Sequence, residues 1–167
     1  VWPLKPNGDV QTDKALIDAL KTNEDKPDVS FFKEFGSAFA ASNPTNSMDL
    51  VRKYMDVNQI ISYAVVDRLI RHDDGPFHWY CNDLASCYNH NYYWFEDKKN
   101  RKMHLIPWDL DGAFEHVVRN TNNIVPIADK WGEISNNCGL INLGNPTFKQ
   151  RSATCDKLTA AWTGFKA

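Results

Sequence analysis

The sequence predicts an α+β fold that is mostly helical and carries one small antiparallel hairpin. Apolar residues recur at helical spacing through the first 70 positions, which is typical of helices with one buried face. Two apolar and aromatic runs, near 91–96 and 103–107, flank the basic turn Lys98-Lys99-Asn100 and predict a hairpin over residues 91–107. Helices and strands that are segregated along the chain in this way favour the α+β class.

Composition limits the classes of function. The chain has 167 residues, of which 43% are hydrophobic, so it is long enough for one domain with a sizeable core. Its formal net charge of -2 gives no broad cationic field, which excludes sequence-wide attraction to nucleic acid. No apolar run approaches the roughly 20 residues of a membrane span. We therefore expect a single domain over residues 1–167, with no nucleic-acid partner and no membrane span.

Helix-start residues mark four helices in the first part of the chain. Asp13 and Ser30 stand at the start of the first two, and a short third helix is expected at 47–54. Asp56 opens the fourth and strongest helix, with Gln59 three positions later as its partner in a capping box. The buried stripe of this helix is expected to contain Ile60, Ile61, Ala64, Val65 and Leu69.

Beyond the fourth helix and outside the hairpin, the chain is expected to be largely irregular. The loop Asp73-Asp74-Gly75-Pro76 ends the fourth helix. Residues 112–147 are rich in asparagine and glycine, with a short helix expected near 128–131. A final helix is expected at about 148–162.

The four cysteines indicate two disulfides and an oxidising compartment. An even number of cysteines in a short chain is typical of secreted proteins. Joining near neighbours pairs Cys81 with Cys87 and Cys138 with Cys155.

A zinc site is the alternative use of two of these cysteines. His78, Cys81, Cys87 and His90 have the spacing H-x2-C-x5-C-x2-H. Four ligands of these types can hold zinc tetrahedrally. The spacing alone leaves both interpretations open.

Acidic and amide side chains collect at the predicted ends of elements. Asp73-Asp74 follows the fourth helix, Asn91 starts the hairpin, and Asp109 and Asp111 end it. Because the two strands of a hairpin run antiparallel, position 91 is expected near positions 109–111. Carboxylate and amide oxygens are ligands that magnesium prefers, so the pattern indicates metal-assisted chemistry on phosphate. The same residues also fit solvated turns or a partial calcium loop.

Neighbouring histidine and aromatic residues are interpreted as structural. We expect His72 and His90 to be hydrogen-bonded side chains rather than bases. Residues 92–95 are Tyr-Tyr-Trp-Phe, which we expect to point to alternate faces of a strand and not to form a base-stacking platform.

Three segments resemble a known family. They are Asp-Gly-Pro-Phe-His at 74–78, His-Asn-Tyr-Tyr-Trp at 90–94 and Ile-Pro-Trp-Asp-Leu-Asp-Gly-Ala-Phe at 106–114. They resemble the spore-coat protein H (CotH) family of secreted, atypical protein kinases, over roughly residues 56–115. The resemblance implies a protein-kinase-like fold, of which this chain is the C-terminal lobe, with the metal-binding residues on its hairpin. It also implies ATP- and divalent-metal-dependent phosphorylation of Ser or Thr hydroxyls on secreted or cell-surface proteins.

The resemblance also implies roles for individual residues. Asp74 is implied as the catalytic aspartate that orients or deprotonates the acceptor hydroxyl, with Asp73 as the alternative at that place. Asn91 and Asp109 are implied as ligands of the Mg2+ (or Mn2+) that bridges the ATP phosphates. Asp111 is implied as an auxiliary ligand.

The chain departs from the family pattern in two ways. Asp74 and Asn91 are 17 positions apart, whereas kinases generally have about five. We interpret residues 79–90 as an extra loop, pinned by a disulfide, that leaves the site intact. The chain also shows neither a Gly-rich loop nor a Val-x-x-Lys strand, so the nucleotide-covering N-terminal lobe is expected as a partner outside residues 1–167. Alone, the chain is expected to bind metal but not to turn over ATP efficiently.

Two further classes of function stay open. The first is a catalytically inactive secreted structural or surface-assembly protein on the same fold. The second is a metal-stabilised binding module, which would use the His78, Cys81, Cys87 and His90 group or the Asp109 and Asp111 pair.

Overall fold

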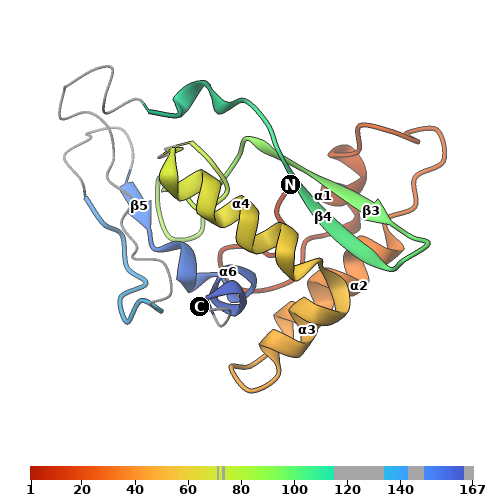
Figure 1. Cartoon of the computed structure of the whole chain (residues 1–167), viewed down its shortest axis with the longest axis horizontal. Coiled ribbons are helices and arrows are strands. Elements are labelled where there is room, and N and C mark those ends of the chain that lie inside the picture. Colours follow the sequence, from red (N-terminus) through yellow and green to blue (C-terminus); the bar gives the residue numbers. More distant parts are fainter. Residues whose placement is uncertain (71, 73, 115–133, 143–148, 164–167) are drawn as a thin grey trace.

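Helices pack around a two-stranded hairpin, and a second small sheet lies towards one end of the molecule (Figure 1). The computed structural model describes residues 1–70, 72, 74–114, 134–142 and 149–163. Its α-helices are α1 (Asp13–Asp18), α2 (Ser30–Ala40), α3 (Ser47–Tyr54), α4 (Val57–Leu69) and α6 (Lys157–Trp162). The described residues also contain two 3-10 helices, η1 (Leu110–Gly112) and η2 (Ala153–Cys155).

The strands in the described part of the chain form two separate antiparallel sheets. In the first, β3 (Tyr92–Asp97) pairs with β4 (Lys102–Pro107), which confirms the predicted hairpin. In the second, β1 (Trp79–Cys81) lies between β2 (Cys87–Tyr88) and β5 (Lys149–Arg151). Helices combined with small antiparallel sheets confirm the α+β class.

Short polar side chains fix the starts of several helices. The Thr12 hydroxyl accepts from a backbone N–H of the first turn of α1, and Asp28 accepts from the N–H of Ser30 at the start of α2. Asp56 caps α4 by accepting from the N–H groups of Asn58 and Gln59. The reciprocal half of the predicted capping box is absent from the described contacts, because the Gln59 amide bonds to β4 instead.

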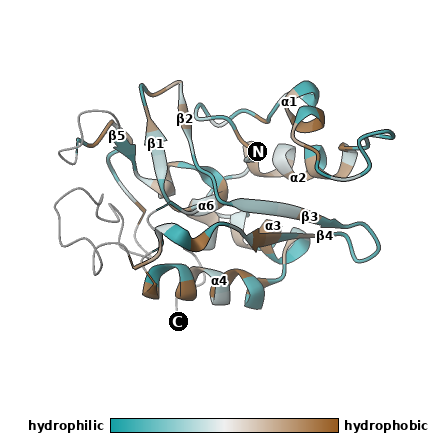
Figure 2. Ribbon diagram, turned by 90° about the horizontal axis from the view of Figure 1, so that it is seen from above, coloured by the Kyte–Doolittle hydropathy of each residue, from teal (hydrophilic) through white to brown (hydrophobic). Residues whose placement is uncertain are grey.

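The predicted buried face of α4 is wrong in part. Ile60 and Ala64 are buried, but Ile61, Val65 and Leu69 are exposed, and Asp67 is buried in their place. Hydrophobic segments are visible on the outer side of α4 in Figure 2. No helix in the described ranges, α4 included, is long and apolar enough to cross a membrane.

The predicted final helix is also wrong over its first half. Residues from Lys149 form β5 and then η2, and the α-helix begins only at Lys157. Asp156 caps this helix by accepting from the N–H of Thr159, which is a helix-start signal that the pattern at 148–162 concealed. The helix expected near 128–131 lies outside the described residues.

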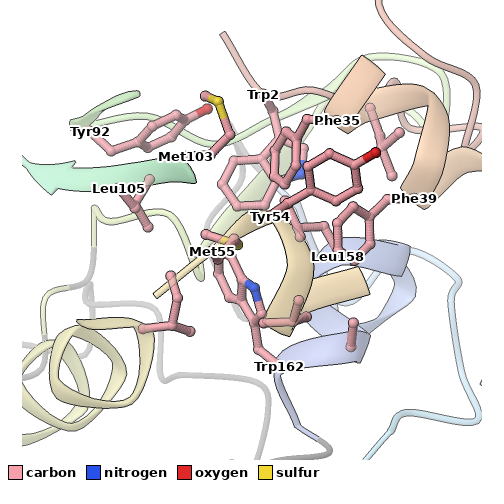
Figure 3. Close-up of a cluster of buried hydrophobic side chains, with 14 of the residues drawn as sticks. Trp2, Phe35, Phe39, Tyr54, Met55, Tyr92, Met103, Leu105, Leu158 and Trp162 are labelled. Atoms are coloured by element: carbon pink, nitrogen blue, oxygen red, sulfur yellow. The ribbon is translucent and has the colours of Figure 1, made fainter. Parts of the chain in front are cut away.

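The core lies between the helices and the inner face of the β3–β4 hairpin (Figure 3). Trp2 occupies a central place in it, with its ring 5.9 Å from that of Trp79, 5.3 Å from that of Tyr92 and 5.8 Å from that of Trp162. Along β3 the residues alternate as expected, with Tyr92 buried and Tyr93 exposed. One core therefore supports both sheets. It does so at the place where the loop after α4 leads into β1 and where β3 begins.

Candidate functional site at the end of the hairpin

The centre of the candidate site is the carboxylate of Asp74, in the loop that follows α4. Asp74 is half-buried, and each of its oxygens accepts a hydrogen bond. His90 Nε2 lies 2.5 Å from Oδ1, and Asn91 Nδ2 donates to Oδ2 over 2.7 Å. Two consecutive residues ahead of β3 thus hold this carboxylate from both sides.

The hydrogen bonds of Asp74 keep its carboxylate ionised. Burial acts to raise the pKa of Asp74, but the hydrogen bond and charge of His90, together with the Asn91 amide, hold that pKa below its ordinary value. Asp74 is therefore an anion at neutral pH, with lone pairs left over, because a carboxylate offers about four acceptor positions.

The hairpin brings Asp109 to the same end as Asn91, as the antiparallel pairing predicted. Tyr92 is opposite Pro107, and the next N–H, that of Trp108, donates to the carbonyl of Asn91 over 3.1 Å. Gly112 then lies against Asp74, since a Cβ atom at Gly112 would be 3.2 Å from the Asp74 Cβ. The segment that carries Asp109 is therefore folded over the Asp74 loop.

A second, buried aspartate–histidine pair holds the backbone of this segment. His72 Nδ1 lies 3.3 Å from Asp67 Oδ1, and His72 Nε2 lies 3.2 Å from the backbone carbonyl of Asp109. Because both ring nitrogens face oxygen acceptors, the cationic form of His72 satisfies both contacts. A Cβ at Gly75 would lie 2.6 Å from the His72 ring, so only glycine fits beside this pair.

The pKa directions of the buried pair agree with this arrangement. Burial raises the pKa of Asp67, although His72 opposes the rise. Burial alone would lower the pKa of His72, but its hydrogen bond to Asp67, the Asp67 charge and the Asp109 carbonyl raise it above the ordinary value.

Backbone strain collects at the same place. Asn91, Asp109 and Phe114 are non-glycine residues with φ of 60°, 51° and 59°, in the left-handed region that such residues seldom adopt. The N–H of Phe114 donates to the carbonyl of Ile70 at the end of α4, which closes the segment. Strained backbone that its surroundings hold in this way is frequent at functional sites.

The structure brings the sequence-predicted site residues together only in part. Asp74 and Asn91 are in direct contact, and Asp109 is tied to the same cluster through its carbonyl. The side chains of Asp109 and Asp111 are exposed. Among the residues whose placement is described, no group of three or more His, Cys, Asp or Glu side chains could hold a metal ion. Asp73 lies outside those residues.

Both disulfides are present, Cys81–Cys87 and Cys138–Cys155. The tetrahedral zinc alternative is therefore wrong, because Cys81 and Cys87 are oxidised and cannot supply thiolates. Its two histidines have other partners, since His90 bonds to Asp74 and His78 Nδ1 lies 3.3 Å from the Gln150 amide. Burial lowers the pKa of His78 to about 3, so this ring is neutral.

Two features of the site were missed from the sequence. The first is the buried Asp67. The helical spacing of apolar residues along α4 did not distinguish its position from those on the solvent-exposed side. The second is the β1–β2 hairpin within residues 79–90, which was expected only as a loop. The alternation of Trp79, Tyr80 and Cys81 was too short to predict a strand.

The fold and this site define a mixed helix-and-sheet protein whose acidic residues gather at the end of one hairpin, around a clamped aspartate. The chain belongs to the CotH kinase protein family, whose family model matches residues 4–154. Membership indicates a kinase-like function in general and agrees with the two disulfides, which are consistent with an extracellular protein. No curated protein and no solved structure matches the chain significantly.

Proposed function

We propose that this protein, in its full-length form, phosphorylates Ser or Thr hydroxyls on secreted or cell-surface proteins, using ATP and Mg2+ or Mn2+. The observation that carries the proposal is the pair of contacts on Asp74. An ionised aspartate is held by Asn91 at the end of the hairpin that also carries Asp109. Phosphoryl transfer depends mainly on positioning and on neutralising charge, which such a cluster can supply.

Asp74 is the residue proposed to orient the acceptor hydroxyl and to accept its proton. The order His72-Asp73-Asp74 matches the His-x-Asp order of the protein-kinase catalytic loop, which favours Asp74 over Asp73. His72 also bonds to the backbone of the segment that carries the second aspartate.

Asn91 and Asp109 are the residues proposed to hold the divalent ion. The Asn91 amide donates its N–H to Asp74, which leaves its oxygen as the acceptor end for a cation. Asp109 offers an exposed carboxylate at the same end of the hairpin as Asn91, and Asp111 is a further exposed carboxylate for an auxiliary role. Mg2+ usually takes one or two carboxylates and completes its shell with water and phosphate oxygens, so this donor set fits it. When bound, the ion neutralises the phosphate charge.

An apolar surface beside the carboxylates supports a nucleotide as phosphate donor. Trp108 is 57% exposed and immediately precedes Asp109. Its ring lies 5.3 Å from that of Tyr93 on the outer face of the hairpin. Aromatic side chains of this kind can stack on a base, whereas an inorganic phosphate donor would gain nothing from them.

The test uses the full-length protein. Transfer of labelled phosphate from ATP to protein hydroxyls is measured with and without Mg2+. Asp109→Ala and Asp74→Ala are expected to abolish transfer, whereas Asp97→Ala, at the far end of the hairpin, is expected to retain it. Full-length protein that binds no Mg-ATP at millimolar concentration would overturn the proposal.

The second candidate is a catalytically inactive surface-assembly protein on the same fold. It is favoured by the full engagement of Asp74, whose two oxygens both accept bonds from protein donors. In this function Asp74 would tie loops together and would meet no substrate. Unchanged assembly of an Asp74→Asn, Asp109→Asn variant at the cell surface, together with no phosphate transfer by the wild type, would select this function.

A further inference from the structure

Residues 79–90 form a small closed element beside Asp74. Its strands β1 and β2 are antiparallel, and Cys81 lies directly opposite Cys87, to which it is joined by a disulfide. The connecting turn is held by Asp83, whose carboxylate accepts from two backbone N–H groups that follow it. The element therefore has a fixed shape of its own.

Both ends of this element are attached to the rest of the site. On one side β1 pairs with β5 over three residues. On the other side Asn89 donates to the carbonyl of Pro76, in the same loop as Asp74, and Tyr92 donates to the Asn89 side chain. The element and the Asp74 loop are therefore held in one position relative to each other.

The element presents one side chain, His90, to Asp74. The His90 ring stacks on that of Tyr88, with ring centres 5.8 Å apart and 30° between planes, and lies 5.5 Å from that of Tyr80. These two contacts fix the plane of the imidazole. Its Nε2 atom then meets Asp74 Oδ1 at 2.5 Å.

His90 and Asn91 are not equivalent as partners of Asp74. The Asn91 amide has a second proposed task at the divalent ion, so its orientation is shared between two groups. No second task is proposed for His90, so its orientation serves Asp74 alone. The pair also remains accessible, since the side chains of His90 and Asp74 are 39% and 35% exposed. A hydroxyl can therefore reach a lone pair of the carboxylate while His90 holds it.

We propose that the disulfide-closed hairpin 79–90 is a positioning element for Asp74, and that it acts through His90. His90 fixes the carboxylate in the orientation that meets the acceptor hydroxyl, and Tyr80 and Tyr88 fix His90. This inference rests on the proposed function and assigns a role to the segment that separates Asp74 from Asn91. Displacements of about 1 Å in such a group can lower a rate by about a hundredfold.

The first experiment compares His90→Ala and His90→Gln in the full-length protein, with kcat and the KM for ATP measured separately. His90→Ala is expected to lower kcat by about ten- to a hundredfold and to leave the KM for ATP within about twofold. Gln carries an amide N–H that can replace Nε2–H, so His90→Gln is expected to recover most of the lost rate. A matched control is His104→Ala, which changes a partly buried histidine of β4 that bonds to Gln59 of α4.

A second experiment tests the route through the disulfide. Replacing both Cys81 and Cys87 with serine is expected to lower kcat to a similar extent. If the disulfide acts through His90, adding His90→Ala to that variant will cause little further loss. Fully multiplicative effects, or an unchanged kcat in His90→Ala, would overturn the proposal while leaving the kinase assignment in place.

A third measurement does not depend on activity. In crystals of the wild type, Asp74 is expected in one conformation, and in His90→Ala it is expected in more than one. An Asp74 that keeps its single orientation without His90 would overturn the positioning role, whatever the catalytic result. Absence of phosphate transfer by the wild type would instead count against the proposed function, and the crystals would still decide the role of His90.

Discussion

Two aspartate–histidine pairs lie within one loop of each other and differ mainly in burial. In the pair of Asp67 and His72 the side chains are 3% and 0% exposed, whereas in the pair of Asp74 and His90 they are 35% and 39% exposed. The buried pair bonds to a backbone carbonyl and fixes the chain that carries Asp109. The half-exposed pair leaves a carboxylate within reach of solvent. Burial, and not residue type, separates the supporting pair from the one suited to chemistry.

The two pairs also have opposite pH dependences. The pKa of Asp67 and that of His72 are raised, so the folded state binds protons more tightly than the unfolded state, and the stability that this pair contributes falls as pH rises. The pKa of Asp74 is lowered, so its contribution is present above the ordinary aspartate pKa and is lost as pH falls below it.

The largest expected effect is on activity, at the half-exposed pair of Asp74 and His90, where stability should change little. Asp74→Asn is expected to lower phosphate transfer by about a thousandfold, because the amide cannot accept the hydroxyl proton. The temperature of unfolding should change by no more than about 2 °C, since a half-exposed ion pair contributes little. Asp97→Asn, at the far end of β3, is the control. A parallel loss of both properties would mean that Asp74 is a supporting residue like Asp67.

Next in size is the effect of breaking the buried pair. Asp67→Ala is expected to lower the free energy of unfolding by about 3–5 kcal/mol, because it leaves the buried His72 ring without its carboxylate partner. The matched change Asp74→Ala should cost less than about 1 kcal/mol. Urea unfolding of the two variants measures both values. Equal losses would remove the distinction between the pairs.

A second buried carboxylate, Asp156, extends the comparison. Its hydrogen-bond donors include the hydroxyl and the backbone N–H of Thr159, both of which are uncharged. Burial raises the pKa of Asp156 to about 6. Its contribution to stability therefore falls as pH rises from about 4 to about 6 and stays low above that range. Asp156→Asn keeps the helix cap without the charge, so it should raise the free energy of unfolding at pH 8 by up to about 3 kcal/mol. Below pH 4 the two proteins should be equal in urea titrations.

The smallest expected effect is a steric test of the exposed pair. Gly112→Ala places a methyl group 3.2 Å from the Asp74 Cβ, closer than most such contacts, so Asp74 must move by a few tenths of an ångström. We expect phosphate transfer to fall by about fivefold with no loss of the folded state, a change of about 1 kcal/mol in the activation free energy. Unaltered kcat would show that the orientation of Asp74 tolerates such a shift.

The elements that depend on local chemistry could be predicted from the sequence. The β3–β4 hairpin follows from alternating residues around a polar turn, and α4 begins where Asp56 caps it. The closeness of Asn91 to the residues after Pro107 follows from antiparallel pairing alone. These features need only neighbours in sequence or across one turn.

The parts that could not be predicted depend on contacts between distant segments. The buried face of α4 was misread because its spacing does not show that Asp67 would find His72 beyond the helix end. The start of α6 was displaced because Lys149–Arg151 joins β1, about seventy residues earlier in the chain. The role of residues 79–90 depends on His90 meeting Asp74, and no local pattern contains that contact.

The indole of Trp2 bears on how the molecule reaches its native state. It touches Trp79 at the base of the disulfide-closed hairpin, Tyr92 next to Asn91, and Trp162 near the other end of the chain. Loops that span most of the polypeptide must close before these rings can meet, and such topologies fold slowly. We therefore expect the acidic cluster to be among the last regions to become ordered during refolding, with quenching of tryptophan emission as its optical signal.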